Sequence, residues 1–430
     1  MSQAGLAASI GARPRSGLAY GALALPLAFL ALPLYVALPL HYAQWHGVPL
    51  AWLGSLLLAT RLLDAGLDPF IGQGIDHLLA GSRRRLTLVA AGAALLVGGG
   101  FVALFFAPFP PGRSSPGLLV WLVLHLLLVY LGYSTLAVLH QAWGTRLGGD
   151  APQRARIAAW REGCGLAGIL LASLLASAGQ RATSSVVLGL TLALGLALLL
   201  RLPSGAKAPA SAFAPAPAWH RPWRAPGFRG LLGVYMLNGI GNAVAATLVG
   251  FFVQDRLQLP ESLPLFLGCY FAAGVLSLPL WLRLVARLGL ATCWLAGMLL
   301  SVAAFAGALA LGPGDGAGFA AVCLASGLAL GADLAVPAAM LTGVVQQARR
   351  PQEAGVYAGW WTAAGKLNLG LAAGLALPLL GWAGYAPGRR DPLALQALSL
   401  AYVLLPCLLK LLAVAGLLHW RRRSLLEIPT

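Results

Sequence analysis

Apolar runs long enough to cross a bilayer recur along the chain, and they constrain its fold more than any other feature of the sequence. About 20 consecutive apolar residues in an α-helix span the hydrocarbon core of a membrane. Within that core each segment must satisfy its own backbone polar groups, which favours helices. About twelve such runs are predicted, at residues 17–44, 49–79, 86–108, 117–145, 155–179, 184–202, 228–253, 262–287, 290–312, 317–346, 354–384 and 393–420.

Composition supports a membrane location. Of 430 residues, 59% are hydrophobic and 10% are charged, a balance that excludes an ordinary soluble domain. The net charge of +17 does not indicate a nucleic-acid partner, because the arginines are spread over short loops without interleaved aromatic residues. The five cysteines lie in apolar runs without paired spacing, so neither a disulfide nor a metal site is expected. The expected partner on this ground is the lipid bilayer.

Basic residues concentrate in every second loop. One set of loops contains Arg83–Arg85, Arg146, Arg154, Arg156, Arg283, Arg287 and Arg421–Arg423. Loops rich in arginine face the cytoplasm in membrane proteins. In the other loops basic residues are fewer and several are offset by acids, as Arg256 is by Asp255. Both termini are therefore expected in the cytoplasm, which requires an even number of spans.

The segment 203–227 is rich in proline, alanine and basic residues and is predicted to be a cytoplasmic linker. It separates an N-terminal half, 1–202, from a C-terminal half, 228–430, which ends in a short basic tail. Two related six-helix bundles around a central path are typical of the major facilitator superfamily. The predicted fold class is an all-α membrane protein with about 12 transmembrane helices in two six-helix bundles.

The second run contains acids where hydrocarbon is expected. The stretch Arg61–Arg85 reads RLLDAGLDPFIGQGIDHLLAGSRRR and carries Asp64 and Asp68 one helical turn apart. Residues at i and i+4 share a helix face. Paired carboxylates there either bind a cation or raise each other's pKa until one holds a proton. Intramembrane acids are costly and mark functional sites, although a structural pair bonded to Arg61, Lys366 or backbone is the alternative.

This stretch resembles the signature of the glycoside-pentoside-hexuronide:cation symporter family, which is typified by the melibiose permease. Further segments resemble the family's fourth, fifth, tenth and eleventh helices, including HQAWGTRLGGDAPQRARIAAWREGCGLAG and GVYAGWWTAAGKLNLGLAAG. The resemblance implies that Asp64 and Asp68 serve the coupling cation and that Lys366, on the eleventh helix, lies near them. It also implies that Arg161 contacts the substrate and that Thr362 lies near the site. Lys366 could instead be a structural counter-ion.

The sequence departs from the family pattern at the expected ligands. Sodium-using members place an asparagine beside the second acid, where this chain has Leu67. The first and fourth helices lack the sugar-binding acids of the melibiose permease. Sodium prefers several oxygen ligands, so the coupling ion is predicted to be H⁺ or Na⁺ with a weak preference for H⁺. A galactoside substrate is not expected.

The remaining candidates are polar or aromatic residues near the expected cavity or the cytoplasmic end. Substrate binding is predicted for Arg161, Thr362, Trp360, His140, Asn238, Asn242 and Tyr20. A gating or folding salt bridge is predicted between Asp76 and the run Arg83, Arg84 and Arg85. Asp333 is expected to partner a nearby polar group, and a second proton carrier is the alternative.

No enzyme motif is present: the sequence contains no G-x-S-x-G, Walker loop, H-E-x-x-H or Cys/His metal spacing. The predicted function is secondary active transport of a small organic solute by alternating access, without a cofactor, by a monomer in the inner membrane. One alternative is export of an amphipathic or lipid-like compound. A non-transporting membrane scaffold or receptor is the alternative from another class.

Overall fold

A computed structural model describes residues 14–31, 33–112, 114–177, 180–203, 219–348, 350–385 and 391–426. Most of the predicted linker, residues 204–218, lies outside the described residues. The chain divides into two compact units. Unit 1 comprises Met1–Pro222 and Val345–Ala363, and unit 2 comprises Trp223–Val344 and Ala364–Thr430. The boundaries of the predicted halves stay a prediction.

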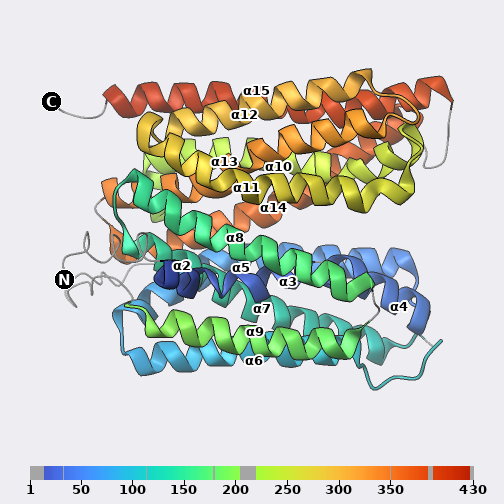
Figure 1. Cartoon of the computed structure of the whole chain (residues 1–430). Helices are drawn as coiled ribbons and strands as arrows, with labels where there is room; N and C mark the ends of the chain where they lie inside the picture. Colours follow the sequence, from blue (N-terminus) through green and yellow to red (C-terminus); the bar gives the residue numbers. More distant parts are fainter. Residues whose placement is uncertain are drawn as a thin grey trace. The chain divides into compact units, whose positions relative to one another are not determined.

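Unit 1 is built from helices of very different lengths (Figure 1). These are α2 (Pro14–Gly21), α3 (Ala24–Phe29), a π-helix (Pro33–Ala37), α4 (Leu38–His46), α5 (Leu50–Ala80), α6 (Arg83–Phe105), α7 (Pro116–Leu147), α8 (Ala151–Ser177) and α9 (Arg181–Arg201). Helix α7 packs along α5 and α6, α8 along α2 and α3, and α9 against α6 and α3. A short 3₁₀ turn (Pro351–Glu353) and the first turns of α14 (Ala354–Trp382) also belong to this unit.

Unit 2 contains the remaining helices. They are α10 (Pro226–Phe251), a π-helix (Phe252–Arg256), α11 (Leu263–Leu288), α12 (Leu290–Gly307), most of α13 (Gly316–Gln347), the rest of α14, and α15 (Pro392–Leu426). Short 3₁₀ turns lie at Pro260–Ser262 and Ala308–Ala310, and a third, Arg221–Arg224, begins in unit 1 and ends in unit 2. Helix α15 packs along α10 and α12, and α11 packs against α12.

Among the described residues, nine helices are long and apolar enough to cross a membrane. Helices α5 and α14, with 31 and 29 residues, and the broken first segment bring the number of spanning segments to about twelve. Large apolar side chains such as Leu95 and Leu276 are 75% and 77% exposed, which suits contact with lipid. The predicted all-α class is confirmed.

The first predicted span is broken rather than continuous. Residues 17–44 were expected to form one helix, whereas the structure has α2, α3, the π-helix and α4 in succession. Pro26 and Pro33 lie in this segment. Because proline lacks an N–H and its ring clashes with the preceding turn, it breaks or kinks a helix.

Glycines let helices approach closely in both units. A Cβ on Gly168 of α8 would lie 2.1 Å from the carbonyl oxygen of Leu25 on α3. A Cβ on Gly327 of α13 would lie 2.4 Å from the carbonyl oxygen of Tyr270 on α11. Small residues at such contacts are typical of helix packing in membranes.

Candidate functional site

The two aspartates of α5 are buried in unit 1. The side chains of Asp64 and Asp68 are 5% and 0% exposed. Ser134 Oγ, on α7, donates a hydrogen bond to Asp64 Oδ1 over 2.6 Å. A buried carboxylate is costly unless charges or hydrogen bonds compensate it, so this face of α5 is polar at a depth where lipid-facing positions are apolar.

Tyr133 on α7 lies where charged side chains of α5 and α8 meet. The charges that act on its hydroxyl are those of Arg61, Asp64, Asp68 and Glu162. Glu162 Oε1 accepts a hydrogen bond from Arg161 Nε over 3.0 Å. Successive residues on a helix project about 100° apart, so these two long side chains bend toward each other. The structure therefore brings Asp64, Asp68 and Arg161 into one polar neighbourhood.

Tyr20 and His140 tie α2 to α7 beside that neighbourhood. The Tyr20 hydroxyl donates to the His140 carbonyl oxygen over 3.1 Å, and His140 Nε2 donates to the Tyr20 carbonyl oxygen over 2.8 Å. Both side chains are 2% exposed, and the charge of Arg161 acts on both. Their polar atoms are engaged with backbone, so the geometry supports positioning of α2 more directly than solute contact.

Asp76, near the end of α5, is held by α7 and the start of α14 within unit 1. Asp76 Oδ1 accepts from an Arg146 guanidinium N–H over 3.1 Å and from the Gly355 amide over 2.8 Å. Asp76 Oδ2 accepts from the Val356 amide over 3.0 Å. Amides in the first turn of a helix lack intrahelical partners and attract anions. Arg146 also donates to the Gln352 carbonyl oxygen over 3.0 Å.

Among the described residues, the ion-pair partner of Asp76 is Arg146 rather than the predicted arginine run. Arg83 donates to the carbonyl oxygens of Leu200 and Leu202, and Arg84 and Arg85 are exposed. The physical reason is that Ser82 accepts a hydrogen bond from the Arg85 amide and starts α6, whose first residue Arg83 bonds to the end of α9 instead. A gating role for Asp76 stays a prediction, with Arg146 as the partner.

Helix α5 approaches α14 through glycines. A Cβ on Gly72 would lie 2.1 Å from the Gly355 carbonyl oxygen, and one on Gly359 would lie 2.3 Å from the Asp68 carbonyl oxygen. Gly355 and Gly359 form a small-xxx-small pair on one helix face. Asp68, Gly72 and Asp76, spaced by four residues, thus face the start of α14 along two turns.

In unit 2 a second group of buried polar residues surrounds Asp333 of α13. Asp333 Oδ1 accepts from Asn238 Nδ2 over 2.9 Å and from Trp294 Nε1 over 2.8 Å. Asp333 Oδ2 accepts from Asn242 Nδ2 over 3.0 Å and from Lys410 Nζ over 3.4 Å. Lys410, 1% exposed, also donates to Asn238 Oδ1 over 2.8 Å. The expectation that Asp333 partners nearby polar groups is confirmed.

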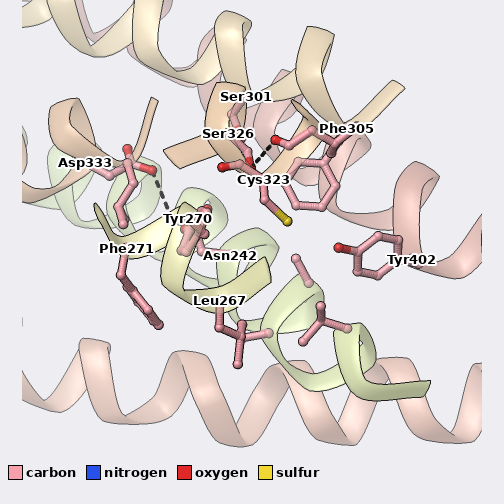
Figure 2. A pocket seen from close by; sticks show the side chains of 15 residues that line it. Asn242, Leu267, Tyr270, Phe271, Ser301, Phe305, Cys323, Ser326, Asp333 and Tyr402 are labelled. Carbon is pink, nitrogen blue, oxygen red and sulfur yellow. Dashed lines mark hydrogen bonds between the residues drawn. The ribbon is translucent and has the colours of Figure 1, made fainter. Parts of the chain in front are cut away.

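A cavity of about 100 Å³ adjoins this network (Figure 2). Its polar lining residues are Asn242, Tyr270, Ser301, Ser326 and Asp333, and its walls include Phe271, Phe305 and Tyr402. Figure 2 shows the carboxylate of Asp333 at one end of the cavity. Of the two predicted asparagines, Asn242 lines the cavity while Asn238 is buried in the network.

The α14 candidates differ in their surroundings. Trp360 Nε1 donates to the Trp219 carbonyl oxygen over 2.7 Å, and Trp360 is half-buried. Thr362 is half-buried. Lys366, 8% exposed, belongs to unit 2, whereas Asp64 and Asp68 belong to unit 1. Lys366 as the partner of the two acids stays a prediction.

No group of three or more histidine, cysteine or acidic side chains suited to a metal ion occurs among the described residues. The network around Asp333 is the arrangement that sequence reasoning missed in part, because Lys410 was not singled out. Its signal was available, since a lysine within the apolar run 393–420 is costly unless it is paired.

Solved structures share this architecture. A bacterial homologue of the iron transporter ferroportin, in an outward-facing state, superposes with a TM-score of 0.69 at 18% identity, covering 95% of this chain and 100% of that one. The transporter FucP in an outward conformation superposes with a TM-score of 0.62 at 12% identity, covering 94% and 99%. The E. coli fucose:proton symporter FucP gives 0.57 at 13% identity, covering 96% and 99%. No curated protein sequence matches the chain.

The family model, together with the fold, defines the class of protein: a multi-pass integral membrane protein of the major facilitator superfamily and a secondary transporter. The sequence profile of the MFS/sugar transport protein family matches residues 17–421, and the chain belongs to that family. The resemblance to sugar:cation symporters noted in the sequence is thereby confirmed at the level of the superfamily.

Proposed function

We propose that the protein is a proton-coupled symporter of a small organic solute that works by alternating access. The observation that carries the proposal is the buried pair on α5: Asp64, bonded by Ser134, lies one turn from Asp68. Two buried carboxylates this close favour the uptake of one cation. Binding of that cation changes the relative free energies of the conformations, which is the basis of coupling.

The choice of a proton over sodium rests on the ligands near the pair. Sodium requires several oxygen ligands, and Leu67, between the two acids, supplies none and is 47% exposed. A proton requires only one carboxylate oxygen. Fucose:proton symport occurs on this fold, so the fold is compatible with proton coupling.

The solute would contact the polar neighbourhood of Arg161 and the first turns of α14. We further propose that the protein acts as a monomer in the inner membrane. Both termini are proposed to be cytoplasmic, because the exposed Arg84 and Arg85 lie at the end of unit 1 expected on the inner side. Lys366 would respond to the charge of Asp64 and Asp68.

The test begins with a thermal-shift screen of purified protein against mono- and disaccharides and their acids, with and without sodium. A stabilising solute is then used for uptake into proteoliposomes under an imposed pH or sodium gradient. Asp64→Asn and Asp68→Asn are compared with Glu261→Gln, an exposed acid outside the site. We expect uptake driven by the pH gradient in wild type and Glu261→Gln, and its loss in both α5 variants.

Other outcomes separate the alternatives. Uptake driven by a sodium gradient alone would assign sodium. Gradient-driven uptake that persists in both α5 variants would show that the coupling site lies elsewhere. If the sugars and their acids are not transported and only amphipathic compounds are, the hypothesis of a lipid exporter replaces that of a symporter. If no solute stabilises the protein, a non-transporting scaffold is favoured.

A further inference from the structure

Two adjoining hollows lie at the end of unit 1 where α4 ends and α9 begins. Their cavity volumes are about 380 and 690 Å³. Both are lined by His41, Trp45, Phe105, Gln180 and Arg181. His46 lines the larger one. None of these residues belongs to the neighbourhood of Asp64 and Asp68.

The histidine nitrogens in the hollows have defined hydrogen-bonding roles. An Arg181 guanidinium N–H donates to His41 Nδ1 over 2.8 Å. Since arginine can only donate, His41 Nδ1 accepts and Nε2 carries the hydrogen. His41 Nε2 has no hydrogen-bond partner among the described residues, so its N–H is a donor without an acceptor.

His46 supplies the complementary group. This side chain is 1% exposed. It bonds to the Pro110 carbonyl oxygen, and Nδ1 has no partner within the described part of the chain. The bond to a carbonyl oxygen makes Nε2 the donor, so Nδ1 of the neutral ring is an acceptor. Buried polar atoms without partners are rare and each requires an explanation.

The charge around these atoms is positive. Arg181 lies 5.8 Å from the centre of the Trp45 ring, and the described residues that line the hollows include no Asp or Glu. Helix α9 starts here, and its N-cap residue Gln180 makes no side-chain capping bond. The amides of its first turn therefore add donors directed outward.

We propose that this pocket binds a protonated phosphate group. Phosphate oxygens would accept from Arg181, from His41 Nε2–H and from the first amides of α9. The P–OH hydrogen would be donated to His46 Nδ1. Such a group is present in free inorganic phosphate and in the headgroup of phosphatidic acid, and the same chemistry recognises both.

Isothermal titration calorimetry on the full-length protein in phosphatidylcholine nanodiscs tests this inference without any need for transport. Inorganic phosphate is titrated against wild type, Arg181→Gln and Arg156→Gln, which is an exposed arginine outside the pocket. We expect phosphate to bind wild type and Arg156→Gln equally and Arg181→Gln about tenfold more weakly or worse. Equal binding to all three proteins, or no binding to wild type, would overturn the proposal.

Sulfate provides the matched ligand control because it carries no hydrogen at neutral pH. It leaves His46 Nδ1 without a donor, so sulfate should bind wild type about tenfold more weakly than phosphate. Equal affinities would contradict the role of His46. His46→Leu should reduce the preference, and if this buried substitution prevents folding, the sulfate comparison in wild type still decides.

A second experiment distinguishes free phosphate from the headgroup of phosphatidic acid. The titration is repeated in nanodiscs that contain phosphatidic acid. Loss of the phosphate response there supports occupation by a lipid headgroup, and an unchanged response supports free phosphate. The failure of solute coupling at Asp64 would affect neither result, because both measure binding alone.

Discussion

The carboxylate of Asp333 shows how one buried charge can organise several helices. Its four hydrogen bonds come from Asn238 and Asn242 on α10, Trp294 on α12 and Lys410 on α15. A buried ion pair is weak evidence of net stabilisation, but removal of one partner leaves an uncompensated charge. Removal of one charge should therefore lower the free energy of unfolding more than removal of both charges.

We expect Lys410→Met to lower the free energy of unfolding by about 3–5 kcal/mol, because Asp333 loses its cation. The double variant Asp333→Asn/Lys410→Met should recover part of that loss, since neither charge remains. SDS titration in mixed micelles, followed by tryptophan fluorescence, measures both. Arg287→Met, at an exposed position, is the control. A double variant no more stable than Lys410→Met would contradict the account.

The sequence identifies individual buried acids but not all of their partners. The cost of an acid in an apolar run identified Asp64, Asp68 and Asp333 as residues with special surroundings. The partner of Asp76 could not be predicted, because Arg146 lies 70 residues away in the chain and the other partners are backbone amides. Backbone groups are the same at every position and leave no trace in a sequence pattern.

At the scale of elements, the close approach of α5 to α14 depends on Gly72 of α5. Gly72 faces the Gly355 carbonyl oxygen, whereas a Cβ on Gly74 would meet no atom within 4 Å. Two glycines on one helix, two residues apart, therefore form a matched pair for mutagenesis.

Gly72→Ala should destabilise the protein by about 1–3 kcal/mol, because the new methyl group forces α5 away from α14. Gly74→Ala should be neutral or stabilising by up to about 1 kcal/mol, since alanine favours the helix over glycine. Thermal unfolding of the two purified variants, compared with wild type, measures the difference. Similar midpoints for both variants would show that the close approach of the helices is not needed.

The spans after the first could be predicted from hydropathy alone, because an apolar run in lipid has to be helical. The path of the first span could not, since the run 17–44 does not say how proline redirects a chain. The glycine pair Gly355 and Gly359 is visible in the sequence as G-V-Y-A-G. Its meaning depends on α5 lying opposite, which only the structure shows.

At the scale of the whole molecule, the charge pattern predicts the orientation in the membrane. The exposed residues Arg84 and Glu261 lie in loops that the charge pattern assigns to opposite sides. Each is accessible enough to carry a chemical label.

We expect Glu261→Cys to react with a membrane-impermeant maleimide in intact cells, and Arg84→Cys to react only after permeabilisation. The five native cysteines are first replaced by alanine, and that variant without an introduced cysteine is the control. The reverse pattern would invert the proposed topology, and labelling of both positions in intact cells would contradict the odd number of spans that the prediction places between the two loops.

The contact of Asp76 has a consequence for the media in which the protein can work. Two of its three hydrogen-bond donors are peptide N–H groups, and the side chain is 6% exposed. Mobile ions screen exposed charges but reach buried ones far less. The junction of α5 with α14 should therefore hold equally well in dilute and in concentrated salt, so a cell whose ionic strength fluctuates would not loosen this end of the transporter.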